Sequence, residues 1–100
     1  MKRGEVYIDS QEILTLESFP PQFRLHVEGS LPTPCHELRA VVSEPNAQNQ
    51  IPVEIYSLVD PNVECIQMLE AFEADISLGS YSSGSYTVLV NGEEAGQINP

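Results

Sequence analysis

The chain has 100 residues, of which 15 are acidic and four are basic, so its formal net charge is −11. This length corresponds to one domain, and we take residues 1–100 as a single unit. Nucleic acids and anionic membrane surfaces are excluded as simple electrostatic partners, because both are polyanions. No apolar run approaches the roughly 18 residues that a membrane-spanning helix requires, so we expect no direct membrane insertion.

The charge is distributed unevenly along the chain. Residues 1–50 contain all four basic side chains and seven acids, whereas residues 51–100 contain eight acids and no Lys or Arg. The acids of the second half can therefore form salt bridges only with the first half or with a bound cation. Two interpretations stay open: an ordinary solvated surface, or a surface that attracts cations or a basic partner.

A hydrophobic period of two dominates the sequence and predicts strands with one buried face and one solvated face. The alternation is clear over Phe23–Val27, Ile51–Ile55, Phe72–Leu78 and Tyr86–Val90. Between 65 and 71 only a short helical turn is expected, because the segment is too short for a stable helix. In chain order, seven strands are expected at about 5–17 (broken near Asp9–Gln11), 22–29, 37–43, 51–58, 70–78, 85–90 and 94–98.

Turn-forming residues separate these strands. Pro20-Pro21, Asp60-Pro61-Asn62 and Asn91-Gly92 each stand between two extended runs, and Asn-Gly is a strong signal for a tight hairpin. Turn signals at intervals of about 8–15 residues are typical of a sandwich of antiparallel strands. We therefore predict an all-β fold, a seven-stranded antiparallel immunoglobulin-like sandwich.

One tyrosine fits this fold prediction. Tyr86 follows Gly84-Ser85 at the start of an expected strand, which is where a structural tyrosine corner occurs, with its hydroxyl returning to the upstream backbone. The alternative is an ordinary aromatic core residue. The chain contains no Trp, and its cysteines fall between strands, so antibody-type domains are not the model.

The two cysteines, Cys35 and Cys65, fit one disulfide in an exported protein; two buried free thiols in a cytosolic protein are the alternative. A bridge over some 30 residues would stabilise the fold by roughly 3–4 kcal/mol. The start Met1–Gly4 is basic, but the apolar stretch of a signal peptide does not follow it. We expect an extracellular or cell-envelope domain whose targeting segment is absent from this chain.

Short motifs carry a resemblance to a known kind of domain. They are Ser18-Phe19-Pro20, Gly29-Ser30-Leu31-Pro32, Cys35, Cys65, Phe72-Glu73, Gly84-Ser85-Tyr86-Thr87-Val88 and Val90-Asn91-Gly92. With them the chain resembles uncharacterised exported bacterial immunoglobulin-like β-sandwich domains, in secreted or lipoprotein contexts, over about residues 18–92. The resemblance implies a fold and an exported setting, and it transfers no catalytic or binding residue.

No catalytic residues and no cofactor are expected. Nucleophilic catalysis needs a Ser or Cys beside an oriented base. His26 falls on the predicted solvent face of its strand, and His36 adjoins Cys35, which a disulfide would block. The cysteines also lack the paired spacing of a zinc site.

Two loop regions are candidates for binding. If the loops gather at one end of the sandwich, they would bring together carboxylates that could hold a hard cation: His36, Asp60, Glu64, Glu93 and Glu94. The segment 79–84 resembles a binding loop in composition, with Tyr81 as its large contact residue. The alternative for Tyr81 is a turn residue that packs on the sheet.

The sequence therefore favours a non-enzymatic exported module that acts through contact with another protein, with no role in nucleic-acid binding. A ligand-binding module for a metal cation or a carbohydrate is the alternative. Exposed aromatic platforms for sugars are few, because the chain has no Trp and only four Tyr.

Overall fold

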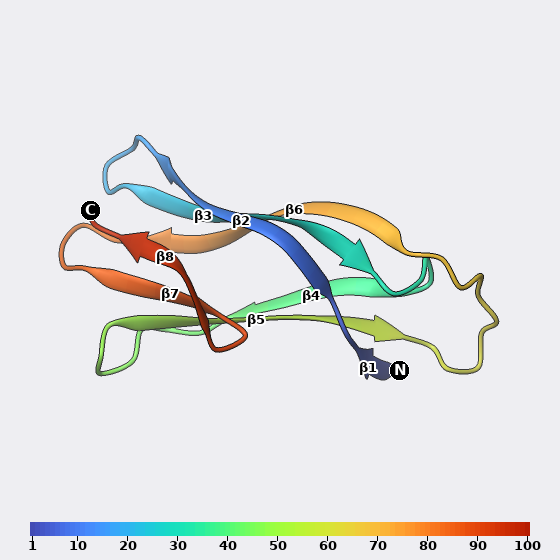
Figure 1. The fold of residues 1–100 in the computed structure, drawn as a ribbon. Coiled ribbons are helices and arrows are strands. Elements are labelled where there is room, and N and C mark those ends of the chain that lie inside the picture. Colours follow the sequence, from blue (N-terminus) through green and yellow to red (C-terminus); the bar gives the residue numbers. More distant parts are fainter.

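The computed structural model describes residues 1–100 and contains eight strands and no helix (Figure 1). There is accordingly no helix with the length and apolar character needed to cross a membrane. The strands are β1 (Lys2–Gly4), β2 (Tyr7–Leu16), β3 (Gln22–Leu31), β4 (Glu37–Val42), β5 (Gln50–Val59), β6 (Glu70–Ser80), β7 (Tyr86–Val90) and β8 (Glu93–Ile98).

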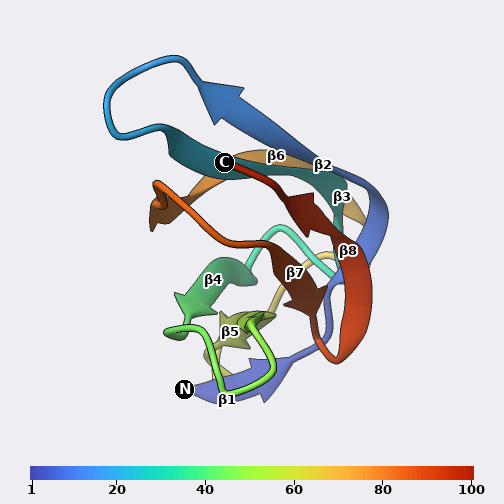
Figure 2. The ribbon, with the colours of Figure 1, turned by 90° about the vertical axis from the view of Figure 1, so that its left-hand side faces the viewer.

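The strands form two sheets that lie face to face (Figures 1 and 2). The smaller sheet has the order β2-β3-β6 and is antiparallel throughout. The larger sheet has the order β1-β5-β7-β8, and β4 pairs with β5. The protein is therefore an all-β, two-layer sandwich, as the period of two predicts.

The core lies between the two sheets and consists of the alternate residues that the sequence pattern marks as apolar. In β3 and β5, every residue that the alternation predicts to face inward is buried. Both strands are covered in this way because each has a neighbouring strand on both sides. The buried residues of the cluster are Phe23, Leu25, Val27, Ile51, Val53, Ile55, Leu78, Val88, Val90 and Ile98. In β6 only Leu78 is fully buried, because β6 is an edge strand.

The structure corrects the predicted strand count and strand direction. There are eight strands rather than seven, because the first predicted strand (5–17) begins only at Tyr7, and a separate β1 precedes it. The predicted break near Asp9 is present as a β-bulge between Ile8 and Ser10. The sandwich is not wholly antiparallel, since β5 and β7 are parallel. Residues 65–71 contain no helical turn.

The strand order matches the immunoglobulin arrangement in one sheet only. β2, β3 and β6 follow the order of immunoglobulin strands A, B and E. In the other sheet, immunoglobulin strands C and F are neighbours, whereas here β5 lies between β4 and β7. The expected immunoglobulin-like topology is therefore not confirmed, because β5 separates β4 from β7.

The chain crosses between the sheets near its start. β1 pairs with β5 in the larger sheet, and β2 pairs with β3 in the smaller one. The buried Ser57 hydroxyl donates a hydrogen bond of 2.7 Å to the Glu5 carbonyl and so fastens the crossing to β5. Next to it, Gly29 of β3 comes so close to β2 that a Cβ there would overlap the carbonyl oxygen of Tyr7.

A disulfide closes one end of the sandwich. Cys35, between β3 and β4, is bonded to Cys65, between β5 and β6, with their Cα atoms 6.1 Å apart. The pairing expected from the sequence is thus confirmed. Thr33, only 6% exposed, accepts a hydrogen bond from the Cys35 amide at 3.2 Å and holds the first of these turns.

We expect Gly29→Ala to destabilise the protein by about 1–3 kcal/mol, because the added methyl group forces β2 and β3 apart beside the bulge. Urea unfolding followed by circular dichroism measures the change. Ser10→Ala, at an exposed position of β2, serves as the control. Equal stability of the two variants would show that the close approach at Gly29 is not needed.

We expect the double variant Cys35→Ser/Cys65→Ser to lose roughly 3–4 kcal/mol of unfolding free energy. The disulfide closes a loop over a sequence separation of 30 residues and so restricts the unfolded chain; without it, the unfolded state has more conformational entropy and is favoured. Dithiothreitol should lower the stability of the native protein by a similar amount and leave the double variant unchanged. Sensitivity of the double variant to the reductant would contradict this account.

Candidate functional site

A cluster of one imidazole and several carboxylates occupies the outer face of the smaller sheet. Alternation along β3 buries Leu25 and Val27 and turns His26 and Glu28 outward. The antiparallel register with β6 places Glu73 opposite Glu28, and Asp75 opposite His26. Opposed residues of neighbouring strands share a face, so the four side chains form the corners of a rectangle.

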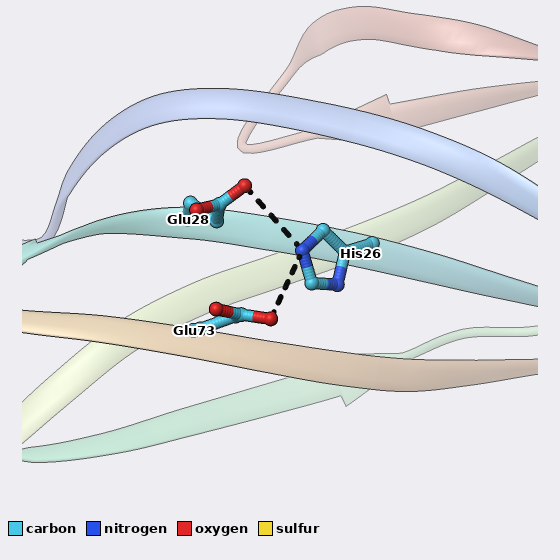
Figure 3. A group of neighbouring side chains, drawn as sticks. All are labelled: His26, Glu28 and Glu73. Carbon is cyan, nitrogen blue, oxygen red and sulfur yellow. Dashed lines mark ion pairs between the residues drawn. The ribbon is translucent and has the colours of Figure 1, made fainter.

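The side chains converge on the imidazole from both sides. Nδ1 of His26 lies 2.6 Å from Oδ1 of Asp75. Nε2 lies 3.5 Å from a carboxylate oxygen of Glu28 and 3.5 Å from one of Glu73 (Figure 3). The longer glutamates reach the far nitrogen, and the shorter aspartate reaches the near one. The His26 side chain is 22% exposed, so it stays accessible from solvent.

The cluster fixes the chemistry of the His26 ring. A carboxylate can only accept a hydrogen bond, so Nδ1 carries the proton and donates a hydrogen bond to Asp75. This hydrogen bond raises the pKa of His26 above its ordinary value of 6.5; partial burial opposes the rise, and the charges of Asp75, Glu73 and Glu28 add to it. In the neutral ring, Nε2 therefore presents a lone pair between two carboxylates.

The expected cation site at the disulfide end is not assembled. Among His, Cys, Asp and Glu side chains, the group whose ligand atoms lie within 4.8 Å of one another is His26, Glu28 and Glu73. Glu93 and Glu94 belong to the β7–β8 hairpin, which lies beside the middle of β5. Two hydrogen bonds, of 2.9 and 3.1 Å, between the Asn91 side chain and the Ile55 backbone hold the hairpin there.

The other three residues of that expected site have local roles in turns. Nδ1 of His36 lies 2.8 Å from the Thr33 hydroxyl, inside the turn before β4. Asp60 accepts a hydrogen bond of 2.9 Å from the Asn62 amide and so forms the turn predicted at Asp60-Pro61-Asn62. Glu64 is exposed next to the disulfide. The β3–β4 and β5–β6 loops meet at the disulfide, but the β7–β8 hairpin does not join them there, although the immunoglobulin prediction requires it.

The two tyrosines singled out by sequence pack against each other, with their ring planes tilted by 46°. The rings of Tyr81 and Tyr86 have centroids 4.8 Å apart, and Tyr81 lies 6.1 Å from Phe23 of the core. The Tyr81 hydroxyl donates a 3.0 Å hydrogen bond to the Leu78 carbonyl. This is the bond to upstream backbone that the sequence analysis assigned to Tyr86. Tyr81 follows its packing alternative and is not a projecting contact residue.

A cavity of about 290 Å³ lies between the start of β2 and the β7–β8 hairpin. It is lined by Val6, Ile8, Gln11, Val90, Asn91 and Glu93. The Gln11 side-chain oxygen is buried there without a hydrogen-bond partner. Since the Asn91 amide is already committed to Ile55, the cavity offers few polar groups that converge on a point.

A loop with exposed apolar side chains occupies the disulfide end. We call residues 60–69, between β5 and β6, the tethered loop, because Cys65 bonds it to Cys35. Its four large apolar side chains are 54–66% exposed: Val63, Ile66, Met68 and Leu69. In Figure 1 this loop projects from the right-hand end of the sandwich.

Neither the cluster around His26 nor the tethered loop was predicted from the sequence, although each leaves a signal in it. His26 and Glu28 are spaced by two on one predicted solvent face, and Glu73 and Asp75 are spaced by two on another. Only the pairing of β3 with β6 brings these faces together. The residues around Cys65 suggested only a short helical turn, whereas the segment is an exposed loop that the disulfide fastens to the β3–β4 turn.

The fold defines a class of protein before any relative is considered: a small two-sheet β-sandwich with one disulfide. Residues 25–99 match the family model described as the ORF11 beta-sandwich domain, and the chain belongs to this family. An uncharacterized 10.2 kDa protein in the HgiCIIM 5' region of Herpetosiphon aurantiacus is 31% identical over 88 residues, which cover 84% of this chain and 89% of that protein. No solved structure matches the chain significantly.

We expect Asp75→Asn to lower the pKa of His26, measured by NMR titration of the imidazole in the presence of EDTA. In the native protein the raised pKa means that His26 stabilises the fold fully below pH 6.5 and loses this contribution as the pH rises through its folded-state pKa. Glu70→Gln, elsewhere on β6, should leave the pKa unchanged. An unaltered pKa in Asp75→Asn would contradict the assigned hydrogen bond.

Proposed function

We propose that this protein is a non-enzymatic binding module that works through contact with another protein, and that the tethered loop is its contact surface. The observation that carries the proposal is the exposure of four large apolar side chains on one ten-residue segment. Contiguous apolar groups at the surface of a small soluble domain mark interaction sites more often than isolated ones do.

The disulfide makes the tethered loop suited to binding. Cys65 fixes the centre of the loop to the β3–β4 turn, and hydrogen bonds from the Asn62 and Val63 amides to Asp60 order its start. A segment that is ordered before binding loses less conformational entropy when it meets a partner. The apolar side chains are thus presented on a restrained backbone.

Charge indicates the chemistry of the partner. Asp60, Glu64 and Glu70 flank the apolar side chains, and the loop contains no basic residue. We therefore infer a partner with an apolar depression rimmed by Lys or Arg. A second copy of this chain is a poor occupant, because each copy carries a net charge of −11 and the two loops would repel each other.

We further propose an exported setting, extracellular or in the cell envelope. The disulfide supports it, because such bonds persist in oxidising compartments. We also propose that the protein is not an enzyme. The Thr33 hydroxyl lies beside His36, as a nucleophile lies beside its base, but Thr33 is buried and its hydroxyl accepts a hydrogen bond from the Cys35 amide. These contacts support a role for Thr33 in holding the turn rather than in catalysis.

We expect the variant Ile66→Ser/Leu69→Ser to weaken binding of the partner at least tenfold without loss of thermal stability, because both side chains are solvent-exposed in the free protein. A photo-crosslinking residue at position 66 identifies the partner in host cells, and the isolated pair is then measured by calorimetry at low and high salt. Affinity should fall as salt rises.

The matched control is Val41→Ser, which removes a 49% exposed side chain from β4. It should leave binding intact. Equal binding by the loop variant and the native protein, or equal loss in the Val41→Ser control, would refute the contact surface. A crosslink between two copies of this chain, supported by a dimer in sedimentation, would refute the proposed kind of partner.

A further inference from the structure

Three carboxylates surround His26, and the strand register brings acidic residues together here. Glu12 on β2 and Asp75 on β6 both stand opposite His26 in the strand register, and Glu28 stands directly opposite Glu73. Like charges at directly opposed positions of neighbouring strands destabilise a sheet. The ion pairs that Arg residues make lie elsewhere, between Arg3 and Glu54 and between Arg39 and Glu37. The carboxylates of the cluster form ion pairs with His26 alone, so a bound cation would relieve the repulsion between them.

The spacing of the ligand atoms matches that of a metal site. Zinc binds imidazole nitrogen and carboxylate oxygen at about 2.0–2.2 Å, so two tetrahedral ligands lie about 3.4 Å apart. Nε2 of His26 is 3.5 Å from oxygens of both Glu28 and Glu73. These atoms all lie within 4.8 Å of one another, on one open face of the sheet (Figure 3).

A fourth residue orients the ring. Asp75 accepts a hydrogen bond from Nδ1 at a nitrogen–oxygen distance of 2.6 Å, which directs the Nε2 lone pair toward the two glutamates. A carboxylate on the far nitrogen is the usual second partner of a metal-bound histidine, and it makes the ring a stronger ligand. The cluster therefore contains both the ligand set and the group that positions it.

We propose that His26, Glu28 and Glu73 bind a divalent transition-metal ion of the zinc type, with Asp75 as the positioning residue. An imidazole in the ligand set favours zinc over magnesium or calcium, which prefer oxygen ligands alone. Three protein ligands on an exposed face leave a fourth position on the ion for water or for a group from another molecule.

The test is calorimetric titration of the full chain, stripped with EDTA and dialysed, with zinc chloride at pH 8 in a buffer that does not bind metals. We expect one ion per chain and a shift of the His26 Nε2 resonance at saturation. His26→Asn should abolish this binding, and Asp75→Asn should weaken it about 10–100-fold. Magnesium chloride at the same concentration should give no saturable binding.

Glu70→Gln is the matched control, because it removes one negative charge from the same strand outside the cluster. It should keep the affinity within about threefold. Circular dichroism confirms that each variant is folded. Zinc binding that survives in His26→Asn, that falls equally in Glu70→Gln, or that magnesium displaces would overturn the proposal; so would the absence of any saturable zinc binding to the native chain.

Discussion

The packing of β3 against β5 is the contact on which the rest of the molecule depends. Phe23, Leu25 and Val27 of one strand and Ile51, Val53 and Ile55 of the other are almost completely buried. Each of these strands also has neighbours on both sides, so their position sets the register of the remaining strands. Because the core is small, burial of these six side chains supplies a large share of the hydrophobic stabilisation.

The same strand that builds the core also builds the cluster on the outer face. In β3 the residues that point inward are apolar, and the residues between them include His26 and Glu28. A slip of one residue in the pairing of β3 would bury the imidazole and expose Leu25. The core therefore holds the outer face in register, and the geometry around His26 follows from hydrophobic packing on the opposite side.

The elements that depend on local pattern could be predicted from the sequence. Strand positions, the turn at Asp60-Pro61-Asn62 and the disulfide all followed from alternation, turn chemistry and cysteine number. The parallel pairing of β5 with β7 could not, because alternation shows which face is buried and says nothing of which strand lies beside which. The residues of the cation site expected at the disulfide end, among them His36 and Glu93, are not brought together for the same reason, because that expectation assumed a loop arrangement that depends on strand order.

The parallel pairing also has a consequence for how the chain folds. Three antiparallel pairs, β2–β3, β4–β5 and β7–β8, join strands that follow each other along the chain and can close early. The pairing of β5 with β7 joins strands that are separated in sequence by the whole of β6, so it closes a longer loop and forms more slowly. Until then one edge of β5 is open to other chains. Two hydrogen bonds between the Asn91 side chain and the Ile55 backbone close that edge: the Ile55 amide donates to the Asn91 Oδ1, and the Asn91 Nδ2 donates to the Ile55 carbonyl.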